Sequence, residues 1–289
     1  MLVVGDLLVD VVALAAEPVA TGADTPARVS VTGGGAGGNV AAWLAAAAHP
    51  VTLVARVGAD PLADIAVAGL AGADLAVTVD PSRPTGRCVV VVGADGTRSL
   101  FPDPGASAAL EPADLPPGRP GAGEHLHLSG YTLLAPGSRA AGLAALARAR
   151  GVGATVSLDP GTTAPIAAVG AARVRGWAAG VDLLLLTDDE ACLLAGQGDP
   201  LAAAAELAGE VGAVVLKRGA RGSAWVTRDT PALHAAAPQV AVVDTTGAGD
   251  AFTGGVLPAW LAGQDARRCL AAGTSVAAVV IARPGARPR

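Results

Sequence analysis

The residues best suited to chemistry lie between positions 244 and 255, which read Asp-Thr-Thr-Gly-Ala-Gly-Asp-Ala-Phe-Thr-Gly-Gly. The apolar run from Val240 to Val243 predicts a buried strand before them, and the residues from Ala251 to Leu261 predict a helix after them. The Gly-Ala-Gly turn then stands at a helix N-terminus. Unpaired backbone N–H groups and the helix dipole make such a turn suitable for an anion such as a phosphate.

Asp250 stands directly beside this predicted anion site. A carboxylate in that place can accept the proton of a hydroxyl group that attacks a phosphoryl group. In the alternative, Asp250 only caps the helix and the glycines only form the turn. The local sequence leaves both interpretations open.

A second glycine-rich run, Gly33 to Asn39, opens a predicted helix from Val40 to Ala48. Its spacing matches G-x-G-x-x-G, so a dinucleotide fold must be considered. The context is poor for it, because a long stretch separates the run from the first strand, and the next strand ends in Arg56 instead of an acid that binds the ribose. An arginine there could bind a 2′-phosphate, so an NADP-dependent oxidoreductase is an alternative. Asn39 would also serve as an ordinary helix N-cap.

Strands and helices alternate along most of the chain, which predicts a mostly parallel sheet covered on both faces, with ligands at the carboxyl ends of its strands. Residues 2–9 predict a first strand that leads to Asp10. The later predicted strands are 51–55, 125–129, 154–158, 183–186, 214–217, 224–227 and 240–243, and the later predicted helices are 138–150, 188–195, 200–210, 250–261 and 266–282.

Three other segments predict a smaller, separate sheet. Residues 28–32 alternate polar and apolar side chains, which favours a half-exposed antiparallel strand. Residues 87–92 and 97–101 are joined by a stretch that contains Asp95-Gly96, a hairpin signal.

Composition excludes several classes of function. The 289 residues are 52% hydrophobic and 16% charged, which is typical of a folded domain rather than a disordered chain. A net charge of −5, with one tyrosine and two phenylalanines, argues against nucleic-acid binding. No apolar run is long enough to span a membrane, and the first residues lack a basic signal-peptide region, so we expect a cytoplasmic protein. Three scattered cysteines form no metal-binding or disulfide pattern.

Two further strand ends carry polar residues that allow either a functional or a structural interpretation. Glu190, after Thr187, is placed to hold a magnesium-bound water or simply to enrich a helix first turn in acid. The glycines after Lys217 allow a nucleotide to approach the backbone or form an ordinary turn. His125 and His127 are interpreted as polar-face residues rather than a metal pair. The sequence has no Walker-type phosphate loop, G-x-S-x-G elbow or H-E-x-x-H pair.

Taken together, the run 244–252 resembles the carboxyl-terminal signature of the ribokinase-like, or PfkB-type, carbohydrate and nucleoside kinases, and the run 34–39 resembles their amino-terminal signature. The resemblance covers essentially the whole chain. It implies a single domain over residues 1–289, a three-layer α/β sandwich with a central, mostly parallel sheet. A small β-sheet lid, from about 11–32 and 77–104, would be inserted in it and would also form a homodimer.

The resemblance also implies a role for each motif residue. Asp250 would be the catalytic base, with an anion hole formed by the amides of Gly247, Ala248 and Gly249. The remaining implied roles are substrate binding by Asp10, Gly34, Gly35 and Asn39, ATP binding by Thr187, Lys217, Gly219 and Gly222, magnesium binding through water by Glu190, and a site for a monovalent cation such as potassium at Asp244 and Thr246, as in those members that have one.

Some positions depart from the family pattern. Thr187 stands where relatives usually carry asparagine, which shortens the side chain next to the metal-bound water, and Ala36 stands where ribokinases often have lysine. We expect ATP-dependent phosphorylation of a hydroxymethyl group on a sugar. The alternatives are a nucleoside kinase of the same family, the oxidoreductase above, and a sugar-binding protein without catalysis.

Overall fold

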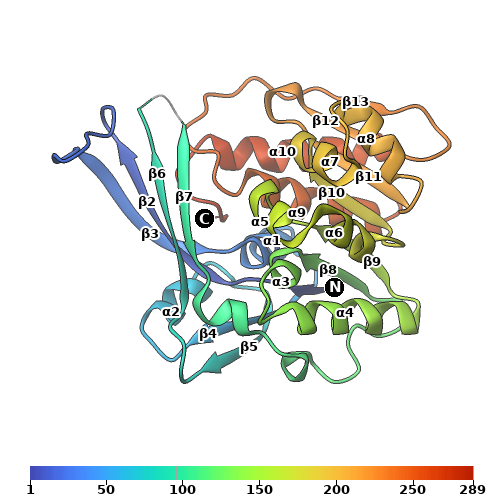
Figure 1. Ribbon diagram of the computed structural model, residues 1–289, viewed down its shortest axis with the longest axis horizontal. Coiled ribbons are helices and arrows are strands. Elements are labelled where there is room, and N and C mark those ends of the chain that lie inside the picture. The colour runs from blue at the N-terminus through green and yellow to red at the C-terminus, as the bar shows by residue number, and fades with distance from the viewer. Residues whose placement is uncertain (95–96, 289) are drawn as a thin grey trace.

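A twisted sheet of nine strands forms the centre of the computed structural model, which describes residues 1–94 and 97–288 (Figure 1). All neighbouring strands are parallel except at one edge, where β12 and β13 run antiparallel to their neighbours. In sheet order the strands are β13 (Leu233–Ala235), β12 (Ser223–Val226), β11 (Ala213–Lys217), β10 (Leu183–Thr187), β9 (Thr155–Asp159), β8 (His125–Ser129), β1 (Leu2–Val4), β4 (Thr52–Gly58) and β5 (Asp74–Asp80).

Helices cover both faces of this sheet, because alternate residues of each buried strand enter two separate hydrophobic clusters. One face packs against α1 (Ala36–Ala46), α2 (Leu62–Val67), α9 (Ala248–Leu261) and α10 (Ala266–Ile281). The other packs against α3 (Tyr131–Leu134), α4 (Arg139–Val152), α5 (Thr163–Val169), α6 (Ala171–Ala178), α7 (Asp188–Ala195) and α8 (Pro200–Leu207). Short 3-10 helices lie at Gly105–Ala109, Pro112–Asp114 and Gly219–Arg221.

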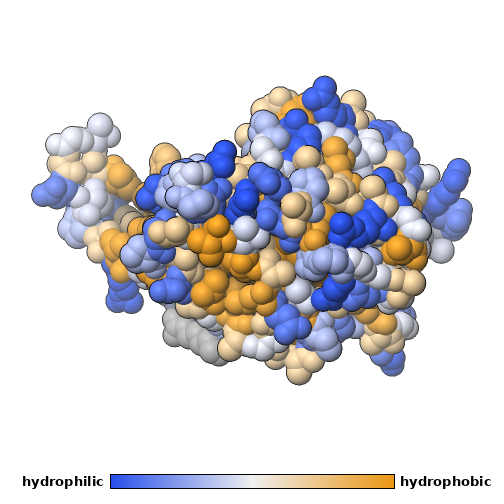
Figure 2. All heavy atoms as spheres, turned by 90° about the horizontal axis from the view of Figure 1, so that it is seen from below, coloured by the Kyte–Doolittle hydropathy of each residue, from blue (hydrophilic) through white to orange (hydrophobic). Residues whose placement is uncertain are grey.

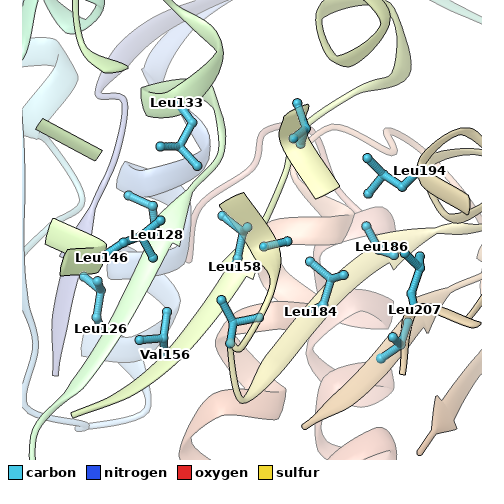
Figure 3. Close-up of a cluster of buried hydrophobic side chains, with 14 of the residues drawn as sticks. Leu126, Leu128, Leu133, Leu146, Val156, Leu158, Leu184, Leu186, Leu194 and Leu207 are labelled. Carbon is cyan, nitrogen blue, oxygen red and sulfur yellow. The ribbon is translucent and has the colours of Figure 1, made fainter. Parts of the chain in front are cut away.

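Figure 3 shows the second of these clusters, in which leucines and valines of β8, β9 and β10 point to the same side of the sheet. Leu158 and Leu186 are fully buried there, and Leu146 of α4 belongs to the same cluster and lies beside Leu126 and Leu128 of β8. This packing fixes the strand ends, which carry the polar residues described below.

A second sheet of four strands projects from the central one (Figure 1). Its order is β3 (Ala27–Gly34), β2 (Leu8–Ala15), β6 (Gly86–Val92) and β7 (Arg98–Asp103). The β2–β3 and β6–β7 pairs are antiparallel, whereas β2 and β6 are parallel. The predicted fold class, a mostly parallel α/β sheet with a small separate sheet, is confirmed. The predicted Asp95-Gly96 turn lies outside the described residues.

Two strand predictions were wrong. Residues 240–243 form no strand, and Val242 and Val243 are 61% and 45% exposed. The Val243 amide donates to the Ile281 carbonyl, at the end of α10, at 2.8 Å instead of joining a strand ladder. The predicted first strand is broken after Val4. Asp10 therefore lies within β2 of the small sheet and not at the end of a central strand.

His125 and His127 also differ from expectation, because both side chains are buried rather than on a polar face. The Ser157 hydroxyl lies 2.8 Å from a ring nitrogen of each. Burial lowers the pKa of His125 to about 3 and that of His127 to about 4, so both rings are neutral at physiological pH. They contribute a buried hydrogen-bond network to the sheet.

Within the described residues, no helix combines the length and the apolar character needed to cross a membrane.

Candidate active site

A cavity of about 1780 Å³ lies between the small sheet and the carboxyl edge of the central sheet. It is larger than the roughly 300–1,000 Å³ of a pocket for one small ligand, so it has room for two ligands side by side. Most of the residues singled out from the sequence line it, namely Asp10, Gly35, Asn39, Thr187, Glu190, Lys217, Gly219, Gly222, Thr246, Gly247, Ala248, Gly249 and Asp250. Gly34 and Asp244 lie behind its wall.

The N-terminus of α9 forms an anion-binding surface in this cavity. Gly247 is the N-cap, with a left-handed φ of 71°, and a Cβ atom there would lie 2.4 Å from Ala286. The Ala248 amide donates to the Thr245 carbonyl at 3.2 Å, whereas the amides of Gly247, Gly249 and Asp250 meet no acceptor among the described residues. These amides and the helix dipole are available to a negatively charged group.

Asp250 lies in the first turn of α9 and does not cap the helix, so the capping interpretation is excluded. Its Oδ2 accepts a hydrogen bond from Asn39 Nδ2 at 2.8 Å. Burial raises the pKa of Asp250 to about 7, an effect that the Asn39 hydrogen bond and the positive charge of Lys217 oppose and that the carboxylate of Asp159 strengthens. A carboxylate with this pKa is suited to accept a proton near neutral pH.

Asn39 reaches Asp250 from α1, whose N-cap is Gly35 rather than Asn39. The interpretation of Asn39 as an N-cap was therefore wrong. The carboxylate of Asp6 takes the capping role, since it accepts hydrogen bonds from the amides of Ala36 at 2.9 Å and Gly37 at 3.3 Å. The Asn39 side chain is therefore not needed as a cap and bonds to Asp250 instead.

Asp10 points into the cavity from β2, where its side chain is buried. Burial raises the pKa of Asp10 to about 6, although the nearby charge of Arg287 opposes this rise. Gly34 lies directly against it, and a Cβ atom at Gly34 would come within 2.4 Å of all three atoms of the Asp10 carboxylate. Glycine is needed at this position to leave room for the acid.

Lys217 and Asp159 form an ion pair that spans the end of β10, since they end β11 and β9 on its two sides. Burial disfavours the charged form of Lys217, but the carboxylates of Asp159, Glu190 and Asp250 together raise its pKa. Burial raises the pKa of Glu190 to about 7 against the opposing charge of Lys217. The positive charge of the Lys217 ammonium thus offsets part of the negative charge of the carboxylates around it.

Glu190 also closes a capping box with Thr187 at the start of α7. The Thr187 amide donates to Glu190 Oε2 at 2.8 Å, and the Glu190 amide donates to Thr187 Oγ1 at 3.3 Å. Glu190 is thus an acid of the first turn of α7, as its structural interpretation predicted. Both residues still line the cavity, where the Glu190 carboxylate adjoins Lys217.

The two glycines after Lys217 differ in what surrounds them. A Cβ atom at Gly222, which has a φ of 82°, would lie 2.0 Å from the Ala235 carbonyl, so glycine is required for packing against β13. Gly219 has a φ of 56° and open space around its Cα atom. The Gly219 backbone is therefore directly accessible to a ligand in the cavity.

Asp244 lies beneath this surface and is 2% exposed. Its two carboxylate oxygens accept hydrogen bonds from the amides of Thr246 at 2.9 Å and Gly285 at 3.1 Å. The Thr246 hydroxyl is buried without a partner among the described residues. Both residues therefore offer oxygen atoms under the N-terminus of α9.

Comparison with known proteins identifies the chain. The model of the pfkB family of carbohydrate kinases matches residues 1–289. The chain belongs to the PfkB family of carbohydrate kinases. Similar proteins include an ATP-dependent ribose-1-phosphate kinase of Halopiger xanaduensis, 31% identical over 89% of this chain and 82% of the relative, and a fructokinase of Klebsiella pneumoniae, 31% identical over 88% and 82%.

The fold agrees with this assignment. The crystal structure of an adenosine kinase from Sinorhizobium meliloti has a TM-score of 0.89, at 23% identity over 99% of this chain and 95% of that one. A PfkB carbohydrate kinase is a phosphotransferase, and the protein is therefore an enzyme. The G-x-G-x-x-G spacing has another explanation here, because Gly33 and Gly34 end a strand of the small sheet and not the first strand of a dinucleotide fold.

Sequence reasoning missed three residues of this PfkB site. Asp159 directly follows the predicted strand 154–158, but its pairing with Lys217 depends on the strand order. Asp6 lies within the predicted first strand, and the amides that it accepts from are 30 and 31 residues further on, so no local pattern marks its role. Arg287 has no local signal either, because the partners of its side chain are all far away in the sequence.

Proposed function

We propose that this PfkB kinase transfers the terminal phosphoryl group of ATP to a hydroxymethyl group of a sugar, with Asp250 as the base. The observation that carries the proposal is the position of Asp250, whose pKa is about 7, beside unpaired amides of the α9 N-terminus in a cavity with room for two ligands.

The sugar would occupy the part of the cavity next to the small sheet. Asp10 and Asn39 supply a carboxylate and an amide for its hydroxyl groups, and the Gly35 backbone allows close approach. Cys88 and Val90 of β6 line the same region and offer an apolar surface. Polar groups there orient a sugar, while the small sheet, acting as a lid, would exclude water.

The nucleotide would lie along the ends of β10 and β11. Lys217 supplies positive charge, the open backbone at Gly219 gives access to the base and ribose, and Gly222 lines the same part of the cavity. Thr187 lines the same part of the cavity. A crystal structure of a putative ribokinase II from E. coli in complex with ATP and Mg²⁺ has the same fold, with a TM-score of 0.85 at 23% identity, and supports ATP as the nucleotide.

Magnesium fits the site as a companion of the nucleotide. No group of three or more potential metal ligands occurs among residues 1–94 and 97–288, and Mg²⁺ commonly binds through water and substrate phosphates with only one or two protein carboxylates. Glu190 is the carboxylate placed to hold such a water. The ion would neutralise phosphate charge, as it does in other phosphoryl-transfer enzymes.

The catalytic step then needs little from the protein beyond position and charge. The sugar hydroxyl gives its proton to Asp250 as its oxygen attacks the phosphorus atom in line with the leaving oxygen. The transition state is loose, so its charge rests on the phosphoryl oxygens. The amides of Gly247 and Gly249 and the ammonium of Lys217 are placed to stabilise that charge. The Ala248 amide, as part of the same turn, would hold its geometry.

We also propose a monovalent cation, potassium, beneath the α9 N-terminus. Asp244 is buried two residues before Thr246, whose backbone carbonyl would be a ligand, and the Thr246 hydroxyl lacks a partner among the described residues. A cation there would add positive charge close to the anion-binding amides. Its expected effect is a higher rate in potassium than in a buffer without it.

The outer face of the small sheet supports a homodimer. Strand register aligns Val31, Val11, Val89 and Phe101 in one row across all four strands, on the side opposite Leu100. Val31 is 48% exposed and Phe101 is 61% exposed. Figure 2, which views the molecule from below, shows the small sheet projecting at the left of the molecule, away from its main body. An apolar face of this kind is typical of a protein interface.

The test is an ADP-release screen across sugars and nucleosides, with and without potassium. We expect ADP only when an acceptor sugar is present. Turnover of nucleosides but not of sugars would favour the nucleoside-kinase alternative. That alternative is supported by the similarity to an aminoimidazole riboside kinase, which is 34% identical over 58% of the chain. ADP release with no acceptor dependence, or a bound nicotinamide absorbance, would contradict the proposal.

A further inference from the structure

Arg287 is a buried cation within the sugar end of the site, although it does not itself line the cavity. Its side chain makes four hydrogen bonds. Nη1 donates to the carbonyls of Ala66 and Ala68, both at 2.7 Å, Nη2 donates to the Gly34 carbonyl at 2.7 Å, and Nε donates to Asn39 Oδ1 at 3.2 Å. No carboxylate among the described residues forms an ion pair with it.

The contact with Asn39 fixes which way its amide faces. Asn39 has one acceptor and one donor end, and here Oδ1 faces the guanidinium while Nδ2 faces Asp250 Oδ2 at 2.8 Å. The flipped amide would place its N–H groups against the guanidinium N–H and its oxygen against a carboxylate. Both contacts would be repulsive, so Arg287 selects the productive orientation.

The glycine run has space for this side chain because two of its members lack a Cβ atom. A Cβ atom at Gly33 would lie 2.1 Å from Arg287 Nη1, and one at Gly38 would lie 2.5 Å from Nη2. Neither glycine has a left-handed φ, so the turn itself does not require them. Part of the glycine-rich run thus accommodates an arginine rather than the substrate.

The segment that carries Arg287 is itself held in place by the catalytic helices. The Trp43 indole of α1 donates to the Ala286 carbonyl at 2.9 Å, and Ala286 packs against Gly247 at the start of α9. The Gly285 amide donates to Asp244 at 3.1 Å. The guanidinium is therefore positioned by the same elements that position Asp250.

We propose that Arg287 is a positioning residue for phosphoryl transfer, acting through Asn39 to hold its amide N–H on the carboxylate of Asp250. The expected effect on kcat rests on the proposed function. The orientation of the Asn39 amide does not, because it can be followed by NMR without turnover. A residue that acts through Asn39 has little effect once the Asn39 side chain is removed.

The kinetic test is a double-mutant cycle of Arg287→Met and Asn39→Ala. We expect Arg287→Met to lower kcat about 10-fold or more with the KM for ATP unchanged, because small misplacements of catalytic groups are costly. In the Asn39→Ala background the same change should have less than about a 2-fold effect. Equal effects in both backgrounds would overturn the proposal. Arg267→Met, at an exposed position on α10, is the matched control and should change neither constant.

A second test does not depend on turnover. The side-chain amide signals of Asn39, assigned by their loss in Asn39→Ala, should be protected from hydrogen exchange in the wild type and lose that protection in Arg287→Met. Gly38→Ala keeps the arginine but intrudes on its guanidinium, and it should produce the same spectral change in a folded chain. Unchanged protection in both variants would contradict the proposal, whether or not a sugar substrate has been found.

Discussion

Replacing Asp250 with asparagine should stabilise the folded protein at pH 8, because the wild-type carboxylate is ionised there at a site that disfavours its charge. Burial raises the pKa of Asp250 to about 7, whereas an aspartate in an unfolded chain has a pKa of about 3.9. A difference of about three units corresponds to at most about 4 kcal/mol, at 1.36 kcal/mol per unit. Water in the cavity screens the charge, so we expect a gain of about 1–3 kcal/mol.

The sign of the pH dependence follows from the same shift. Between about pH 4 and pH 7 the folded state binds the Asp250 proton more tightly than the unfolded state does, so this group's contribution to stability falls as the pH rises. Asparagine does not titrate but still accepts the hydrogen bond from Asn39. The stability difference between variant and wild type should therefore be largest at pH 8 and vanish near pH 4.

Urea unfolding followed by the fluorescence of the four tryptophans measures this difference at each pH. Asp229→Asn, at an exposed loop position, is the control and should show no such trend. The reasoning would be refuted by an Asp250→Asn variant that is no more stable than the wild type at pH 8. A gain of the same size at pH 5 and pH 8 would refute it equally.

Three further outcomes are expected. Asp10→Ala should raise the KM for the sugar at least about 10-fold in steady-state assays and leave the KM for ATP unchanged, since its carboxylate faces the lid side of the cavity; an effect on ATP alone would contradict this. Glu190→Gln should raise the Mg²⁺ concentration that gives half the maximal rate, and an unaltered Mg²⁺ titration would argue against its role. Phe101→Lys should give a monomer in sedimentation velocity, whereas Leu100→Lys, on the opposite face, should leave a dimer; monomers or dimers from both would contradict the proposed interface.

Sequence patterns correctly predicted those strands and helices whose formation depends on neighbouring residues in the chain. The leucines from Leu183 to Leu186 lie in a buried parallel strand, and the acids after them begin α7 at Asp188 as predicted. The same rule was wrong at Val240 to Val243, where the Val243 amide bonds to the end of α10 and no ladder forms with the edge strand β13. Val240 and Val242 instead line the cavity.

The candidate site was predictable to the extent that its residues lie in short motifs. Asp250 and Asn39 come from two glycine-rich runs, and the structure joins them by a hydrogen bond across 211 residues of sequence. Asp159 and Lys217 meet only because β9 and β11 flank β10. Arg287 contacts residues more than 200 positions away, so no local pattern in one sequence points to it.

The most direct test of the account is the turnover of Asp250→Asn with the sugar that the wild type phosphorylates. Asparagine keeps the shape of the site and the contact with Asn39 but cannot accept a proton, so we expect sugar-dependent ADP release to fall below about 1% of the wild-type kcat. Nucleotide binding, measured by calorimetry, should be retained. A kcat above a few per cent of the wild-type value, with nucleotide still bound, would contradict the assignment of Asp250 as the base.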